Sequence, residues 1–164
     1  MKYYGKRSLA SFLKVLLDIL LFIGTILFVW VSVETLSKGF NNLEFYKKMV
    51  ICFMFILGSI ALMLVIINLR RIMKSVVDSN PFIKQNVKSL KTISISCFII
   101  ANCYLINFFM NIKYGKYNFI FIDKSGIHTD MEFLIFFFAG SFILVLYKVF
   151  EKAVEVKEEN DFTI

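Results

Sequence analysis

Residues 49–69 read MVICFMFILGSIALMLVIINL, a run of 21 residues without a charged side chain. At 1.5 Å per residue, a helix of this length covers about 31 Å, close to the thickness of the hydrocarbon core of a bilayer. An apolar run this long predicts a transmembrane helix. The helices of soluble proteins have shorter apolar runs, and most carry polar residues along one face.

Three similar runs accompany it, at residues 13–33, 92–110 and 132–149. Hydrophobic residues make up 59% of the 164 residues, with 20 phenylalanines, against about 45–50% in soluble proteins. We therefore expect an all-α integral membrane protein, a single domain over residues 1–164. The predicted fold is a four-helix bundle whose helices extend into the cytoplasm.

The positions of lysine and arginine predict the orientation. Residues 1–14 hold four, residues 70–91 hold six and residues 148–164 hold three, whereas residues 34–48 and 111–131 hold three each. Because basic residues concentrate on the cytoplasmic side, both termini and residues 70–91 are expected in the cytoplasm, with the protein in the cell membrane. The net charge of +7 is dispersed between apolar runs, so direct nucleic-acid binding is not expected.

Residues 70–91 are expected to form a helical hairpin around the only proline of the chain, Pro81. Asn80 is a good N-cap and Pro81 suits the first position of the second helix. One face of that helix is apolar and the other carries lysines. The hairpin could pack back on the bundle with its lysines on anionic lipid, or it could dock a cytoplasmic partner. The candidate partner-binding residues are Asn80, Pro81, Phe82, Lys84, Asn86, Val87, Lys88 and Leu90.

The pattern Asn-Pro-Phe-x-x-x-Asn-Val-x-x-Leu-Lys-x-Ile, formed by residues 80–93, resembles the signature of the YoaS-like small bacterial membrane proteins. That family is defined only as a domain of unknown function. The end of the chain, residues 158–164, is also similar to its closing pattern. The resemblance implies four spans, a cytoplasmic central loop and frequent genetic pairing with a small helix-turn-helix DNA-binding regulator. It implies no biochemical activity.

Polar residues inside the spans are the other candidates for function, because ionisable groups are costly in a membrane. Asp18 is one helical turn from Lys14 and could pair with it, or it could form a proton or cation site. Asn68, Asn102 and Asn107 could form hydrogen bonds between helices. Asp18 therefore carries the alternative function of a small transporter, channel or immunity-type membrane protein.

The sequence favours a regulatory or binding protein over an enzyme. We expect no catalytic residue, cofactor or metal site, because the single histidine, His128, has only Asp123 and Asp130 nearby in the sequence. The cysteines Cys52, Cys97 and Cys103 are read as packing residues. Besides the bilayer and the regulator, a second copy of the chain is a further possible partner.

The tail, residues 150–164, is expected to be the acidic segment of an otherwise basic cytoplasmic surface. Its acids could pair with Arg70 and Arg71 or with Lys84 and Lys88 of the central loop. Such pairs are individually weak when exposed, at about 0–1 kcal/mol, so only a network of them would hold the two segments together.

Overall fold

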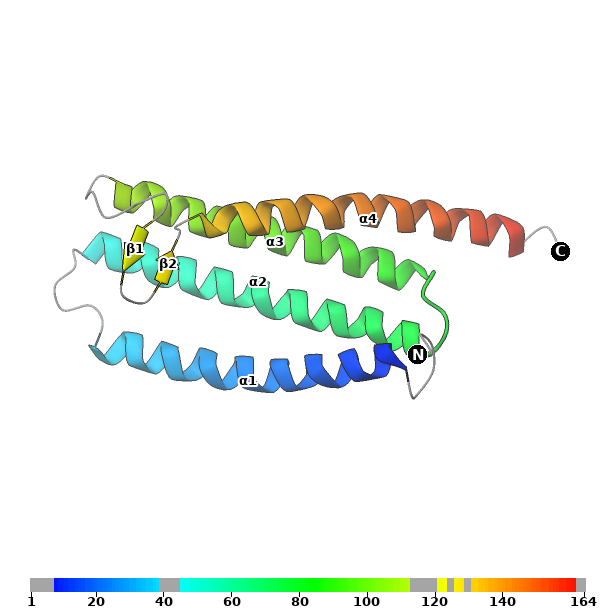
Figure 1. Cartoon of the computed structure of the whole chain (residues 1–164), viewed down its shortest axis with the longest axis horizontal. Coiled ribbons are helices and arrows are strands. Elements are labelled where there is room, and N and C mark those ends of the chain that lie inside the picture. Colours follow the sequence, from blue (N-terminus) through cyan, green and yellow to red (C-terminus); the bar gives the residue numbers. More distant parts are fainter. Residues whose placement is uncertain (1–7, 39–44, 113–120, 124–125, 129–130, 162–164) are drawn as a thin grey trace.

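The computed structural model describes residues 8–38, 45–112, 121–123, 126–128 and 131–161. Nearly all of them belong to four helices, α1 (Leu9–Lys38), α2 (Phe45–Val77), α3 (Lys84–Ile112) and α4 (Glu132–Asp161) (Figure 1). The predicted all-α fold with four helices is confirmed. A short antiparallel β-hairpin of β1 (Phe121–Asp123) and β2 (Gly126–His128), in which Ile122 lies opposite Ile127, was not predicted.

Each of the four helices is long and apolar enough to cross a membrane, and each contains one predicted span. The helices have 29 to 33 residues, so they are about 44–50 Å long against a hydrocarbon core of about 30 Å. They must therefore tilt or project from the membrane. We call the end with the α2–α3 turn, residues 78–83, the hairpin end, and the opposite end the loop end.

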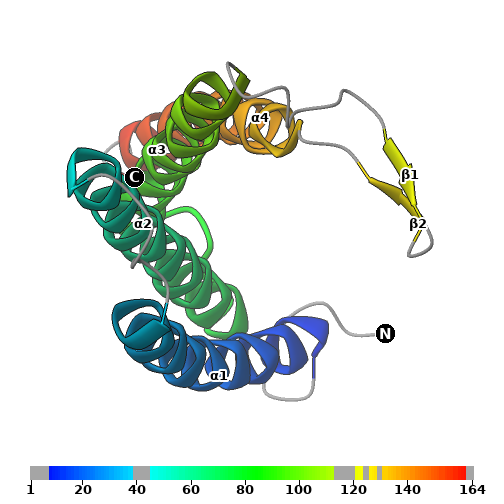
Figure 2. The same ribbon diagram turned by 90° about the vertical axis from the view of Figure 1, so that its left-hand side faces the viewer.

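The four helices form an open arc. In the described part of the chain, each helix packs only on its neighbours in sequence: α1 on α2, α2 on α3, and α3 on α4. Figure 2 shows the resulting curved arrangement, with α1 and α4 at its two edges and a wide concave side between them. The most apolar stretch of α1 contains no buried residue, as expected for a helix with most of its surface towards lipid.

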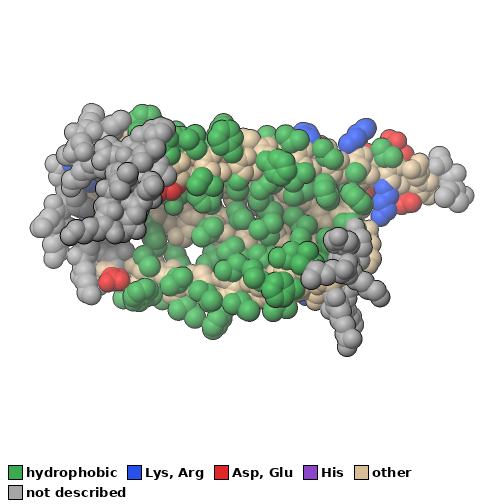
Figure 3. Space-filling model, viewed as in Figure 1, with side chains coloured by type: hydrophobic (Ala, Val, Ile, Leu, Met, Phe, Trp, Pro, Cys, Tyr) green, Lys and Arg blue, Asp and Glu red, His purple; other side chains and the backbone are tan. Residues whose placement is uncertain are grey.

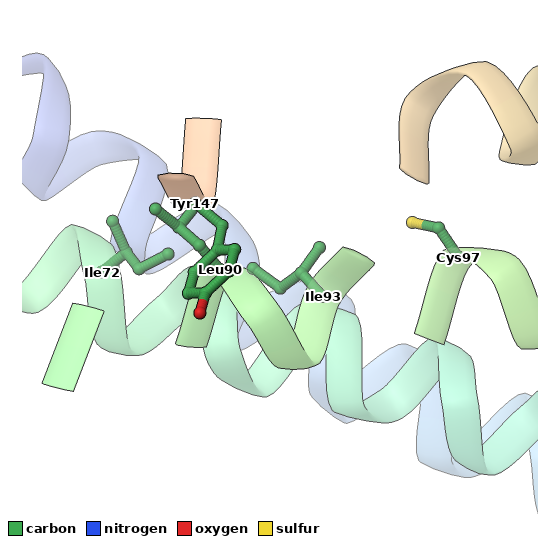
Figure 4. Close-up of a cluster of buried hydrophobic side chains, with 5 residues drawn as sticks. All are labelled: Ile72, Leu90, Ile93, Cys97 and Tyr147. Atoms are coloured by element: carbon green, nitrogen blue, oxygen red, sulfur yellow. The ribbon is translucent and has the colours of Figure 1, made fainter. Parts of the chain in front are cut away.

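The best-packed region lies at the hairpin half of the array. Ile72, Leu90, Ile93, Cys97 and Tyr147 form a buried cluster in which α2, α3 and α4 all take part (Figure 4). Farther from the hairpin end, α3 and α4 approach closely at Gly140. A Cβ atom placed there would lie 3.1 Å from the Cys97 Cβ and 3.3 Å from the Ser94 carbonyl oxygen. The Ser94 hydroxyl donates a hydrogen bond to the Gly140 carbonyl oxygen at 2.8 Å.

The turn between α2 and α3 begins with a Schellman cap. The Asn80 N–H donates to the Ser75 carbonyl oxygen at 3.0 Å, and the Ser79 N–H donates to that of Val76 at 3.1 Å. Ser79 has a φ of 59°, the left-handed conformation that this cap requires. The backbone N–H of Asn80 is thus part of the end of α2.

The predicted start of the second hairpin helix at Asn80 and Pro81 is therefore wrong. Helix α3 begins at Lys84, and the Ile83 carbonyl oxygen accepts the first bond, from the Asn86 N–H at 2.9 Å. The physical reason is that Asn80 already closes α2 through its backbone, so the chain needs residues 81–83 to reverse direction before a new helix starts.

Candidate functional site

Asn86, the central asparagine of the pattern formed by residues 80–93, points into the protein. Its side chain is 1% exposed. Its Nδ2 donates hydrogen bonds to the Ser75 Oγ at 2.5 Å and to the Pro81 carbonyl oxygen at 2.6 Å. The Ser75 hydroxyl in turn donates to the Ile72 carbonyl oxygen at 2.7 Å. Asn86 thus ties the end of α2, the turn and the start of α3 together.

The other candidate residues of the hairpin divide between the interior and the surface. Leu90 is buried in the core, and Val87 packs against it partly buried. Phe82 remains 43% exposed, with its ring 5.3 Å from the ring of Phe150 on α4. The two lysines, Lys84 and Lys88, are exposed. Asn86 and Leu90 of α3 thus face the protein and hold the two helices together, whereas Phe82 lies in the turn before α3 and stays partly exposed.

A groove between α3 and α4 lies at the hairpin end. It has a volume of about 330 Å³ and is lined by three lysines of α3, three glutamates of α4 and three less polar residues. Figure 3 shows charged side chains gathered at this end of α4, whereas hydrophobic side chains cover the middle of the array. The lining residues are Lys84, Val87, Lys88, Lys91, Tyr147, Glu151, Val154, Glu155 and Glu158.

The far part of α4 lies alongside the hairpin and contacts it directly. Lys84 Nζ pairs with Glu158 Oε2 at 2.8 Å. Lys157 Nζ donates to Asn80 Oδ1 at 3.0 Å. The hypothesis that the tail pairs with the central loop thus has a structural counterpart at Lys84. Arg70 has another partner, described below, and residues 162–164 of the tail lie outside the described residues.

Glu151 is the best-anchored carboxylate of the groove. It accepts hydrogen bonds from Lys148 Nζ at 2.8 Å and from the Tyr147 hydroxyl at 2.7 Å. These two donors hold the pKa of Glu151 below its ordinary value, with Lys148 as the larger cause. Lys91 lies 5.9 Å from the centre of the Tyr147 ring. This cluster was not predicted from the sequence, although Tyr147 and Glu151 are four residues apart and so share one face of a helix.

Lys88 differs from the groove residues that form ion pairs, and from Lys91, whose ammonium group lies near the Tyr147 ring. Lys84 is paired with Glu158, and Lys152 with Glu155 at 3.0 Å. No ion pair involves Lys88 in the described part of the chain. Its ammonium group is exposed at the rim of a groove, so it is available to an acidic group from outside the protein.

The intramembrane candidate Asp18 pairs with Arg70 of α2. The expected pair with Lys14 is replaced by this contact between helices, because α1 and α2 are antiparallel and bring the two residues to a similar depth. Both side chains keep more than a third of their surface exposed, at 45% for Arg70 and 41% for Asp18. The pair therefore links α1 to α2 near the hairpin end.

Two of the three asparagines expected to bond between helices, Asn68 and Asn102, bond within their own helices instead. The Nδ2 of Asn68 donates to the Leu64 carbonyl oxygen at 2.8 Å, and that of Asn102 to the Phe98 carbonyl oxygen at 3.1 Å. Both bonds stay within one helix, because a carbonyl four residues earlier is the nearest acceptor. Asn107 lines a second cavity, near the loop end.

No group of three or more potential metal ligands was found among the described residues. The backbones of Asp123 and His128 belong to β1 and β2, but their side chains and all of Asp130 lie outside the described residues. Cys52, Cys97 and Cys103 are free thiols on α2 and α3.

Comparison with known proteins identifies a family but no activity. Residues 13–164 match the protein family DUF2975, described as a protein of unknown function. No curated protein and no solved structure matches the chain significantly. The family match agrees with the resemblance to a domain of unknown function, although it does not carry the name YoaS. Because the match covers more than nine-tenths of the sequence, the chain belongs to the DUF2975 family of proteins of unknown function.

Proposed function

We propose that the protein is a membrane-anchored regulatory protein whose hairpin end lies in the cytoplasm and binds a soluble partner in the α3–α4 groove. The observation that carries this proposal is the groove itself, with Lys88 exposed and without an ion pair among the described residues. The excess of lysine and arginine at this end supports its cytoplasmic orientation.

The groove favours a protein partner over nucleic acid. Three glutamates stand opposite the three lysines, so a phosphate backbone would meet repulsion as well as attraction. Val87, Val154 and Tyr147 add apolar surface between the charges, a mixture typical of protein interfaces. A small helix-turn-helix regulator, the partner implied by the family resemblance, is the proposed occupant. It would present an acidic side chain to Lys88.

The test is recovery of the partner from native membranes with the full-length protein as bait. Lys88→Glu should reduce recovery of a small helix-turn-helix protein at least tenfold, about 1.4 kcal/mol, because it repels the same acidic group. Lys88 is a sharper target than Phe82 or Lys84, since those side chains contact Phe150 and Glu158.

Lys74→Glu is the matched control, since Lys74 is an exposed lysine at the hairpin end that does not line the groove. It should recover as much partner as the unchanged protein. If the unchanged protein recovers no such regulator, or if the two variants recover equal amounts, the groove is not the docking site.

The alternative function, a small transporter, channel or immunity-type protein using Asp18, has less support. Transporters commonly bind their substrates at interrupted helices, whereas α1 to α4 are continuous over their described lengths. Asp18 also has Arg70 as its partner, which accounts for a carboxylate at this depth without a transported ion.

The role of Asp18 can be decided with a double-mutant cycle. We expect Asp18→Asn and Arg70→Gln each to lower the free energy of unfolding by no more than about 1 kcal/mol, because the pair is half exposed. The double variant should lose little more than either single variant. Ion flux and membrane potential should not change. A large change in flux for Asp18→Asn that Arg70→Gln does not share would instead support the transport function.

A further inference from the structure

A second cavity lies in the other half of the array, towards the loop end. It has a volume of about 410 Å³ and is lined by residues of α2 and α3 together with Phe136 of α4. Because the helices follow one another around an arc, a cavity lined by three of them in succession lies on the concave side. Figure 3 looks onto that side and shows hydrophobic side chains lining its hollow.

The cavity is elongated along α2. On α2 its lining runs from Val50 to Leu62, a length of about 18 Å at 1.5 Å per residue. This is a little more than the half-thickness of a bilayer core of about 30 Å. Its lining is almost entirely apolar along this length, as a site for one acyl chain requires.

The walls of the cavity are suited to a hydrocarbon chain. Gly58 leaves it open on the α2 side, since a Cβ atom there would meet nothing within 4 Å. Tyr104 and Phe136 form the opposite wall, with ring centres 5.7 Å apart and an angle of 12° between the rings. Such stacked rings give a flat apolar surface.

Two lysines of α2 lie just beyond the loop end of the cavity lining. Lys47 precedes Val50 and Ile51 by three and four positions on α2, so it shares their face of the helix and continues the lining outwards. Lys48 is its neighbour, and Asn107 lines the cavity from α3. Two lysines at the membrane surface attract anionic headgroups. The charge of Lys47 and Lys48 at this level is sufficient for that attraction, whatever other contacts the two side chains make.

We propose that the cavity binds one anionic phospholipid, with an acyl chain between α2 and α3 and its phosphate near Lys47 and Lys48. The chain would pass Gly58 and lie against Tyr104 and Phe136. This site is separate from the α3–α4 groove at the hairpin end and does not depend on the proposed regulator. It accounts for a deep apolar cavity that opens on the concave side of the array.

The test uses the full-length protein in nanodiscs of equal parts phosphatidylglycerol and phosphatidylcholine, followed by gentle detergent extraction and native mass spectrometry. The unchanged protein should retain one phosphatidylglycerol, at least fivefold more often than phosphatidylcholine. Gly58→Leu should reduce the retained lipid at least fivefold, because leucine fills the cavity. The melting temperature of Gly58→Leu should not fall, since leucine is a better helix former than glycine.

The double variant Lys47→Gln with Lys48→Gln tests the headgroup. It should abolish the preference for phosphatidylglycerol.

Thr25→Leu is the matched control, because it places the same residue on an exposed position of α1, away from the cavity. It should retain lipid as the unchanged protein does. Equal retention of the two lipids by the unchanged protein would overturn the proposal. So would full retention by Gly58→Leu. A loss of dimers in Gly58→Leu with lipid retention unchanged would also overturn it, and would assign the surface to a second copy of the chain.

Discussion

Gly140→Val should lower the free energy of unfolding by about 2–5 kcal/mol, because it forces apart the two helices with the most extensive contact, α3 and α4. A Cβ atom alone would lie 3.1 Å from the Cys97 Cβ and 3.3 Å from a backbone oxygen, which cannot move aside as a side chain can. The Cγ atoms of valine need still more room. Separation would also break the Ser94–Gly140 hydrogen bond and leave a fully buried hydroxyl without a partner.

The measurement is thermal or denaturant unfolding of the purified protein in mild detergent. Gly58→Val is the matched control, since it makes the same change within a helix at a position where a Cβ atom meets nothing within 4 Å. Gly58→Val should be neutral or slightly stabilising through its higher helix propensity. If both variants melt at the same temperature as the unchanged protein, the helices do not approach as closely at Gly140 as described.

The four spans could be predicted from the sequence because lipid imposes a strong and simple requirement, an apolar run of about 20 residues. The open arc could not. Periodicity identifies the packed face of a helix only when its other face is polar, and α1 is apolar all round. Small residues allow helices to approach closely, and Gly140 is such a site. The sequence could not show which helix would meet it.

The site was predicted in part. The acidic tail does reach the basic hairpin, because α4 continues as a helix to Asp161 and carries Glu158 to Lys84. The pair of Asp18 with Arg70 was not predicted, because Lys14 is the nearest base to Asp18 in the sequence. The similar depth of Asp18 and Arg70 along their helices could have indicated this pair. Asp18 is nine positions from the start of α1 and Arg70 is seven from the end of α2, about 13 and 10 Å from the same end.

Asn86→Ala should lower the free energy of unfolding by about 2–4 kcal/mol, even though it removes a residue expected from the sequence to contact a partner. The substitution deletes both hydrogen bonds from Nδ2, to Ser75 Oγ and to the Pro81 carbonyl oxygen. It also leaves a cavity at a position that is 1% exposed. Loss of this contact frees the turn, so protease cleavage within residues 78–83 should accelerate together with the fall in melting temperature.

Two further variants separate the contributions. Asn86→Leu keeps the number and branching of the side-chain heavy atoms, so it leaves no cavity but removes both hydrogen bonds. Its cost should be smaller than that of alanine but still above about 1 kcal/mol. Asn102→Ala, on the same helix, removes an exposed asparagine whose bond is to its own helix, and it should change stability by less than about 0.5 kcal/mol. If Asn86→Ala instead left stability and cleavage unchanged while abolishing recovery of the partner, Asn86 would be a docking residue. The pattern formed by residues 80–93 would then be an interaction surface, and its asparagine would not be what stabilises the α2–α3 turn.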